Sequence, residues 1–206
     1  YYEKQFRNNA LIRTVHYGTH IEGNELNLSQ AEKVLLGQDV VARERDIQEV
    51  INYRKAMERI SELRIIHSAG SGQESLELRI TEDTIREIHK LTVNKILPSD
   101  KCGVFRTTGV VVKNSRTGEV SFRPPRAEEV LPQIQDLLSF INNSSAQDVH
   151  PILKSGIVHY ELVRIHPFLD GNGRVARALS TFILFLEGYD IRKFFSLEEY
   201  FDSDAN

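Results

Sequence analysis

The sequence has very little sulfur and no tryptophan: its 206 residues include one cysteine and one methionine. A single cysteine, Cys102, excludes a disulfide within the chain and any zinc site built from several thiolates. Because so little cysteine fits a reducing compartment, we expect a cytoplasmic protein. The only methionine is Met57 and the first residue is Tyr1, so we expect the sequence to be a fragment of a longer chain.

Long apolar runs and an excess of charge are also missing. No uninterrupted apolar stretch approaches the ~18 residues of a membrane-spanning helix, so we expect no membrane partner. Lysine and arginine number 26 against 29 aspartate and glutamate, and this near balance gives no sign of a nucleic-acid partner. With 40% hydrophobic and 27% charged residues, the chain has the composition of a globular protein that folds alone.

Apolar residues recur at helical spacing through most of the sequence. This spacing predicts helices over about 47–66, 81–98, 130–141, 151–165 and 174–187. Two short β-prone runs, Val110–Lys113 and Glu119–Phe122, flank turn-forming residues and predict a β-hairpin. We therefore expect an all-α fold that carries one short hairpin.

A polar loop joins the last two predicted helices and reads His-Pro-Phe-Leu-Asp-Gly-Asn-Gly-Arg from His166 to Arg174. Gly171 and Gly173 let the backbone come close to a ligand just before a helix start, where unpaired N–H groups favour an anion. Arg174 and Arg177 are three residues apart, so they share a helix face and add two cations suited to phosphate oxygens. The loop therefore predicts a phosphate-binding site.

Two more side chains of this loop carry chemistry. Asp170 offers a carboxylate suited to Mg²⁺, which proteins usually hold with one or two carboxylates plus substrate phosphates. His166 exchanges a proton near neutral pH and is suited to general-base catalysis. Taken singly, such residues are more often helix caps, turns or solvated groups. Their convergence within twelve residues is what indicates a site.

The run from His166 to Arg177 resembles the Fic family signature His-Pro-Phe-x-Asp-Gly-Asn-Gly-Arg-x-x-Arg and matches it at every specified position. The resemblance covers most of the chain, since Gly103–Arg106 and Pro124-Pro125 on either side of the hairpin look like the family's target-docking flap. It implies a mainly helical Fic-type fold, with residues 1–100 as an N-terminal helical region and residues 101–206 as the Fic core. Fic proteins transfer AMP from ATP to a hydroxyl of a target protein with Mg²⁺.

The resemblance also implies a role for each residue of the loop. His166 would deprotonate the target hydroxyl, which then attacks the α-phosphorus of ATP, and Asp170 would hold Mg²⁺. The implied nucleotide ligands are Gly171, Asn172 and Gly173 at the α- and β-phosphates, Arg174 at the β-phosphate and Arg177 at the γ-phosphate. The target segment would bind as an added strand along the hairpin at 110–122.

A second motif lies near the start of the chain, where residues 19–24 read Thr-His-Ile-Glu-Gly-Asn. It resembles the Fic inhibitory motif Ser/Thr-x-x-x-Glu-Gly/Asn, although the hydroxyl position falls on Gly18, next to Thr19. In the family, the glutamate pairs with the second signature arginine and obstructs the γ-phosphate position. The resemblance therefore implies that Glu22 pairs with Arg177 and inhibits the enzyme.

Several alternatives stay open from the sequence. The same site removes AMP from a modified target if Glu22 orients a water, and relatives with altered signatures transfer other phosphate-linked groups. A nucleotide-sensing helical interaction module is an alternative of a different class, although sensing phosphates does not require His166. The target, the modified residue and the oligomeric state are not determined, and a homo-oligomer is among the alternatives.

Two other patterns, one for a dinucleotide and one for zinc, have less support in the sequence than the phosphate site. Gly171–Ala176 also fits the glycine pattern of dinucleotide-binding proteins, with Asp190 about twenty residues on, but that motif requires a preceding strand. His16 and His20 are four residues apart, as zinc ligands on a helix can be, without an accompanying cysteine or His-Glu-x-x-His motif. We therefore favour the interpretation of the loop as a binding site for the phosphates of ATP.

Overall fold

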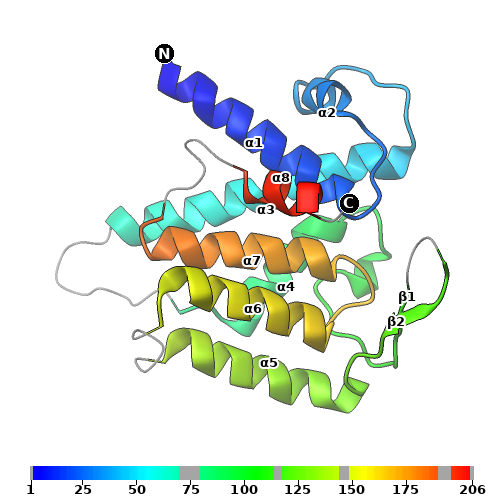
Figure 1. The fold of residues 1–206 in the computed structure, drawn as a ribbon, viewed down its shortest axis with the longest axis vertical. Coiled ribbons are helices and arrows are strands. Elements are labelled where there is room, and N and C mark those ends of the chain that lie inside the picture. The colour runs from blue at the N-terminus through cyan, green and yellow to red at the C-terminus, as the bar shows by residue number, and fades with distance from the viewer. Residues whose placement is uncertain (1, 70–78, 114–116, 144–148, 190–195, 205–206) are drawn as a thin grey trace.

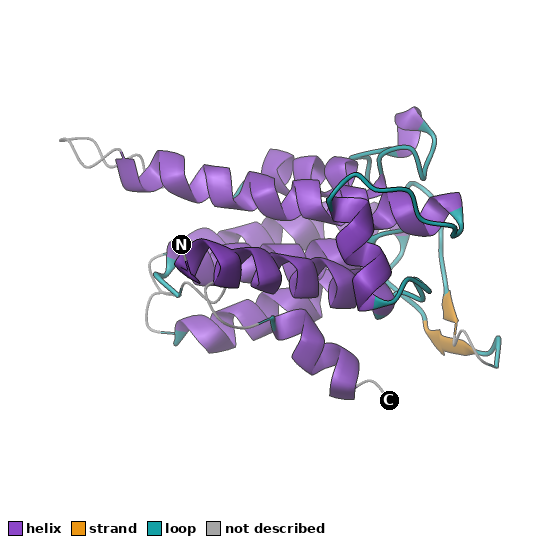
Figure 2. Ribbon diagram, turned by 90° about the horizontal axis from the view of Figure 1, so that it is seen from above, coloured by secondary structure: helices purple, strands orange, loops and turns teal. Residues whose placement is uncertain are grey.

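The structure is a computed structural model that describes residues 2–69, 79–113, 117–143, 149–189 and 196–204. The helices of these residues are α1 (Tyr2–His20), α2 (Leu28–Leu35), α3 (Glu44–Ala69), α4 (Glu82–Val93), α5 (Ala127–Asn142), α6 (Pro151–Ile165), α7 (Asn172–Leu186) and α8 (Leu197–Asp204), with a short 3-10 helix, η1 (Ser99–Lys101). Strands β1 (Val112–Lys113) and β2 (Val120–Phe122) form one antiparallel hairpin. Figures 1 and 2 show the hairpin standing out from one end of the helical body, so the predicted all-α fold with one hairpin is confirmed.

Helix α7 is the centre of the fold. All of its residues from Arg174 to Phe185 are buried, and it packs against α1, α3, α4 and α6. Its apolar side chains join one core with those of the surrounding helices, each fully buried one stabilising the fold by about 1.5–3 kcal/mol. The N-terminus of the most tightly packed helix therefore presents the signature loop. The division at residue 100 stays a prediction.

Several predicted elements differ in length from those observed, and α3 and α5, for example, are longer than their apolar spacing indicated. Helix α4 begins after its predicted cap, where Thr81 Oγ1 accepts the Thr84 N–H at 3.2 Å, but it ends at Val93 instead of near Pro98. The chain leaves the helix at Asn94 and enters the left-handed region at Lys95 (φ 61°), while the Asn52 amide binds the Asn94 carbonyl at 2.7 Å. Strand β1 begins at Val112, two residues after the predicted start.

Helices α1 and α8 pack against each other beside α7 (Figure 1). Arg13 of α1 forms a two-bond ion pair with Glu199 of α8, and His20 Nδ1 lies 2.7 Å from Asp202 Oδ1. Because α1 ends at His20, two residues before Glu22, these contacts help to position the motif at 19–24. None of the described helices is long and apolar enough to cross a membrane.

Candidate active site

The signature loop turns sharply between α6 and α7 because two residues adopt left-handed conformations. His166 caps α6 with φ 50°, an uncommon value for a residue other than glycine, and its backbone N–H binds the Leu162 carbonyl at 3.0 Å. Gly171 caps α7 with φ 80°, and a Cβ there would lie 2.8 Å from Val93 Cγ1, so both conformation and space require glycine. The loop between these two turns leads from His166 to the first N–H groups of α7. A helix precedes the loop, and not the strand that a dinucleotide motif requires.

Asn172 holds the loop in this shape. Its Oδ1 accepts the Phe168 N–H at 2.9 Å and its Nδ2 donates to the Phe168 carbonyl at 2.9 Å, and the residue is only 3% exposed. The structure therefore places this amide on the loop's own backbone. A contribution to phosphate binding would come from the loop shape that it fixes.

The imidazole of His166 has a defined tautomer. Nδ1 lies 3.3 Å from the Val163 carbonyl, so Nδ1 carries the hydrogen and Nε2 the lone pair. Burial lowers the pKa of His166 below its ordinary value, and the nearby Arg106 cation also lowers it, against the opposing effect of the bond to Val163. A neutral ring with an unprotonated Nε2 is the form that a general base requires.

Arg106 ties the hairpin segment to the signature loop. Its guanidinium donates to the carbonyls of His166 (2.7 Å), Pro125 (2.6 Å), Thr108 (3.0 Å) and Ile165 (3.3 Å), and its backbone N–H donates to the Pro167 carbonyl at 2.8 Å. The sequence identified Arg106 only as part of the flap. Because its partners are backbone carbonyls, no side-chain pattern could have shown this role.

His89 of α4 is a second residue that the sequence did not single out. Its Nδ1 accepts the Gly103 N–H at 2.9 Å, so Nε2 carries the hydrogen and donates to the Asp170 carbonyl at 3.0 Å. Its ring stacks on Phe168 with 3.7 Å between centroids. Burial lowers the pKa of His89 to about 4, consistent with this neutral form. His89 thus connects the start of the flap segment to the loop.

The carboxylate of Asp170 is surrounded by donors. Oδ1 accepts the Gly171 N–H at 2.6 Å and Arg174 Nη2 at 3.1 Å, while Oδ2 accepts Arg45 Nη2 at 2.7 Å. Burial alone would raise the pKa of Asp170, but Arg174, Arg45 and the Gly171 N–H outweigh burial and lower it. The group is therefore an ionised carboxylate at neutral pH.

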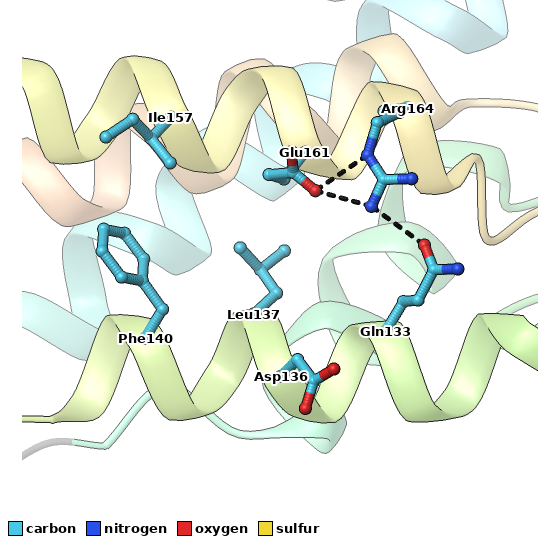
Figure 3. A pocket seen from close by; sticks show the side chains of 7 residues that line it. All are labelled: Gln133, Asp136, Leu137, Phe140, Ile157, Glu161 and Arg164. Carbon is cyan, nitrogen blue, oxygen red and sulfur yellow. Dashed lines mark hydrogen bonds and ion pairs between the residues drawn. The ribbon is translucent and has the colours of Figure 1, made fainter.

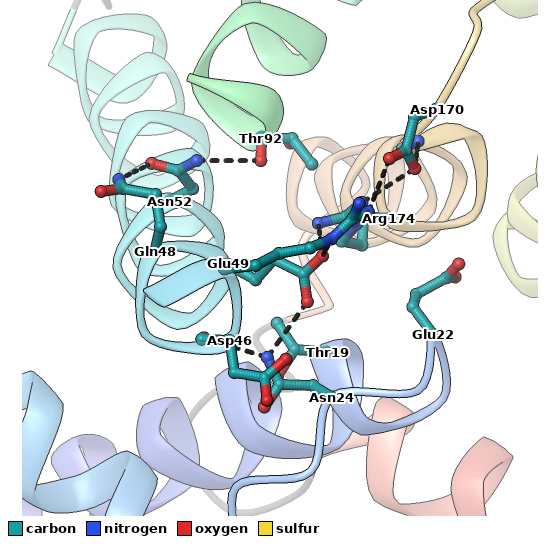
Figure 4. A network of polar contacts seen from close by, with 12 residues as sticks. Thr19, Glu22, Asn24, Asp46, Gln48, Glu49, Asn52, Thr92, Asp170 and Arg174 are labelled. Carbon is teal, nitrogen blue, oxygen red and sulfur yellow. Dashed lines mark hydrogen bonds and ion pairs between the residues drawn. The ribbon is translucent and has the colours of Figure 1, made fainter. Parts of the chain in front are cut away.

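Arg174 is a buried residue whose guanidinium is only partly hydrogen-bonded. It is 1% exposed, and its Nη1 lies 3.3 Å from Glu49 Oε1 of α3 (Figure 4). Within the described residues its Nε and Nη1 have no hydrogen-bond partner, although buried donors are nearly always satisfied. An anionic ligand at the start of α7 is the type of group that would satisfy them.

Arg177 contacts the motif at 19–24. Its Nη2 donates to Glu22 Oε1 at 2.7 Å and to the Gly18 carbonyl at 2.8 Å. Any side chain at Gly173 would overlap the Glu22 carboxylate, which therefore lies directly over the first turn of α7. Burial lowers the pKa of Arg177, but Glu22 and the neighbouring Tyr53 and Glu198 outweigh it and raise the pKa. Glu22 and Arg177 are thus brought together as the resemblance implied.

The hydroxyl of the inhibitory motif has no counterpart in this contact. Thr19 Oγ1 donates to the carbonyls of Val15 and His16 within α1, at 3.0 and 2.9 Å. A side chain at Gly18, the motif's hydroxyl position, would overlap the ring of Tyr53. Asn24, the residue after the motif's last position, binds the core, because its Nδ2 donates to Glu49 Oε2 at 3.1 Å and to the Asp46 carbonyl at 3.0 Å (Figure 4).

Two partly open pockets of the described residues lie away from the signature loop. One of about 220 Å³ opens between α5 and α6, where Arg164 donates to Glu161 and Gln133 (Figure 3). The other, of about 190 Å³, lies between α6, α7 and α8 and includes Arg177 and Glu198. Neither of these two is lined by His166 or Asp170, and the candidate site is assigned from its donors and carboxylate.

The residues around Asp170 suit a cation only together with a ligand. Among the described residues no group of three or more His, Cys, Asp or Glu could hold a metal ion. One ionised carboxylate beside an anion-binding helix start fits Mg²⁺, which is commonly held by one carboxylate and substrate phosphates. His20, considered above as a zinc ligand, is paired with Asp202.

Comparison with known proteins agrees with this arrangement. The family model described as Fic/DOC family matches residues 79–184. Proteins named protein adenylyltransferase fic-1 from Caenorhabditis briggsae and Caenorhabditis elegans are 34% and 33% identical over 177 residues, which is 85% of this chain and 32% of each relative. The chain thus spans about a third of the length of these curated relatives.

Solved structures give the same result. A Fic family protein from Desulfovibrio desulfuricans G20 matches 97% of this chain and 55% of its own, with a TM-score of 0.78 at 27% identity. A Fic domain containing signaling protein from Bacteroides thetaiotaomicron VPI-5482 matches 98% of this chain and 70% of its own, with a TM-score of 0.80 at 26% identity. The helical fold around the signature loop is therefore shared.

Proposed function

The chain belongs to the Fic/DOC family, and from this premise we propose that it is a protein adenylyltransferase, transferring AMP from Mg²⁺–ATP to a Ser, Thr or Tyr hydroxyl of a target protein. The observation that carries the proposal is one short loop that holds the His166 ring with its hydrogen on Nδ1 and leads directly into the N-terminus of α7, where Arg174 Nε has no hydrogen-bond partner among the described residues. A base and an anion site at one turn are what phosphate transfer to a hydroxyl needs. The curated relatives carry the same activity in their names.

The start of α7 would hold the nucleotide. The backbone N–H groups at Gly171 and Gly173 would bind the α- and β-phosphates in the loop that Asn172 shapes. Arg174 would bind the β-phosphate and Arg177 the γ-phosphate. Asp170 would hold Mg²⁺, which neutralises phosphate charge when bound. These fixed donors favour the charge that spreads over phosphate oxygens in the transition state.

His166 would act on the target and not on the nucleotide. Its Nε2 takes the proton of the target hydroxyl, whose oxygen forms a bond to the α-phosphorus as the bond to the β-phosphate oxygen breaks. Pyrophosphate leaves and the target carries AMP. The target hydroxyl would be held in line by a segment paired with the 110–122 hairpin, which Arg106 fastens beside His166.

Glu22 would inhibit this reaction. It occupies an Arg177 donor and lies over Gly173, where the terminal phosphate would sit. ATP would then bind only in a pose that misplaces its α-phosphorus. Removal of AMP from a modified target is a second activity open to the same residues, because Glu22 is a carboxylate within the site.

Labelling distinguishes these activities. The protein is incubated with a cell lysate and ATP labelled at either the α- or the γ-phosphate, followed by denaturing electrophoresis. Adenylyl transfer predicts labelled protein from α-labelled ATP only. Labelled protein from γ-labelled ATP would indicate phosphoryl transfer instead, and loss of label from a premodified target would indicate AMP removal. The cytoplasmic location and a homo-oligomer stay predictions.

A further inference from the structure

Arg45 reaches the signature loop from outside the family's motifs. It lies in the first turn of α3, and its Nη2 donates to Asp170 Oδ2 at 2.7 Å across 125 residues of sequence. Its Nε donates to Glu49 Oε1 at 3.0 Å. The Arg45 side chain is 57% exposed, whereas that of Glu49 is 5% exposed. A surface cation is thus anchored on a buried carboxylate and aimed at the carboxylate proposed to hold Mg²⁺.

This contact uses the oxygen that a metal ion would need. Oδ1 of Asp170 already accepts the Gly171 N–H and Arg174, both of which belong to the buried loop. Among the described residues, Oδ2 is bound by the exposed Arg45 guanidinium alone. A divalent cation binds a carboxylate oxygen at about 2.0–2.1 Å, so it and a guanidinium hydrogen-bonded to that oxygen compete for the same lone pairs and repel each other.

We propose that Arg45 competes with the metal ion for Asp170, so that Arg45 has to move away when Mg²⁺ enters with the nucleotide. The inference rests on the function proposed above, because it requires a cation at Asp170. Arg45 is then a residue that sets metal affinity without touching the reacting atoms. The ion pair is weak enough to be broken, since pairs with a solvent-exposed partner add little to stability.

A metal-binding measurement tests the competition without catalysis. The free Mn²⁺ signal in electron paramagnetic resonance is followed during titration of the protein with Mn²⁺ and ADP, compared with ADP alone. ADP lacks the γ-phosphate, so the contact between Glu22 and Arg177 does not obstruct it. Arg45→Met keeps the side-chain stem and removes charge and donors. We expect Mn²⁺ to bind the complex of this variant about 2- to 5-fold tighter than that of the wild type.

Arg43→Met is the matched control for charge. Arg43 lies two residues earlier and binds Asp46, Glu25 and the Gly23 carbonyl, so the variant loses one positive charge without changing the contacts of Asp170. Its Mn²⁺ affinity should equal that of the wild type. In an Asp170→Asn background, Arg45→Met should have no effect. An equal gain from both arginine variants would show a long-range charge effect and overturn the proposal.

Two other outcomes are also decisive. Unchanged or weaker Mn²⁺ binding by Arg45→Met, with wild-type binding that depends on Asp170, would overturn the competition while leaving the proposed function intact. Wild-type Mn²⁺ binding that is insensitive to Asp170→Asn would instead overturn the proposed metal site, and this inference with it. Circular dichroism confirms that each variant is folded.

Discussion

The signature loop and the inhibitory segment meet at Arg177 but are held in place by different kinds of contact. The loop is fixed by buried groups bonded to backbone: His89, Arg106 and Asn172 are each at most 4% exposed. The segment at 19–24 has buried bonds too, from Asn24 to Glu49 and the Asp46 carbonyl, but α1, which leads into it, is docked on α8 by ion pairs whose Arg13 and His20 side chains are 44% and 46% exposed. Buried bonds are costly to break and exposed pairs are not. The contacts that shape the loop are therefore costlier to break than the ion pairs that dock α1 beside Glu22.

The largest expected effect comes from the loop. His166→Ala should lower the rate of AMP transfer by roughly 10²–10⁴-fold, because the general base is lost while the phosphate donors remain. Nucleotide binding should change little. Transfer from α-labelled ATP in single-turnover assays measures the loss, and calorimetric titration with ATP measures binding. A variant that transfers at the wild-type rate would exclude His166 as the base.

The inhibitory segment should show an effect of opposite sign. Glu22→Gly should raise transfer on the order of 10²-fold, since it releases Arg177 and corrects a misplacement of about 1 Å in the reacting geometry. The gain should disappear in a Glu22→Gly, His166→Ala double variant. Equal labelling by wild type and Glu22→Gly at matched Mg²⁺–ATP would show that Glu22 does not inhibit.

The free energy of unfolding should also distinguish the contacts of the signature loop from those between α1 and α8. Arg106→Met leaves buried carbonyls without their donor and should lower the free energy of unfolding by at least about 2–3 kcal/mol. Arg13→Met, which removes an exposed pair with Glu199, should lower it by less than about 1 kcal/mol. Urea unfolding of both variants compares them directly. Equal losses would mean that the two regions are not held differently.

The smallest expected effect is on pH dependence. Because burial and Arg106 lower the pKa of His166, transfer by Glu22→Gly should rise with pH through a midpoint below the ordinary value of 6.5 and then level off. The base acts when neutral, so activity is lost as pH falls through the lowered pKa. Profiles of kcat/KM give the midpoint. A midpoint at or above 6.5 would show that partial burial and Arg106 do not lower the pKa of His166.

The sequence predicted well those features that depend on residues close to one another in the chain. The signature loop lies between α6 and α7 as its glycines and flanking apolar spacing indicated, and the hairpin is where its β-prone runs are. Helices α1 and α8 were not predicted from periodicity. In α1 the first eight residues described are polar or exposed, and α8 has only eight residues. Neither has a clear apolar stripe for spacing to reveal.

What the sequence missed depends on distant contacts. Arg45 meets Asp170 across 125 residues and His89 meets its carbonyl across 81, and neither spacing is periodic. Arg106 bonds only to carbonyls, which every residue carries. The contact between Glu22 and Arg177 spans 155 residues and was expected only from the family resemblance. Such contacts depend on which helices pack together, and this packing cannot be inferred from the spacing of residues in one sequence.

The carboxylate of Glu22 over Gly173 also has a thermodynamic meaning. A group that occupies a ligand's place while attached to the same chain is a tethered competitor, and its strength depends on its effective concentration, in the millimolar range even for a flexible tether. Raising the ATP concentration is then an inefficient way to displace it. Any change that shifts α1 away from α7 lowers that effective concentration directly. The rate of transfer would then depend more on whether α1 is docked against α7 than on the concentration of ATP.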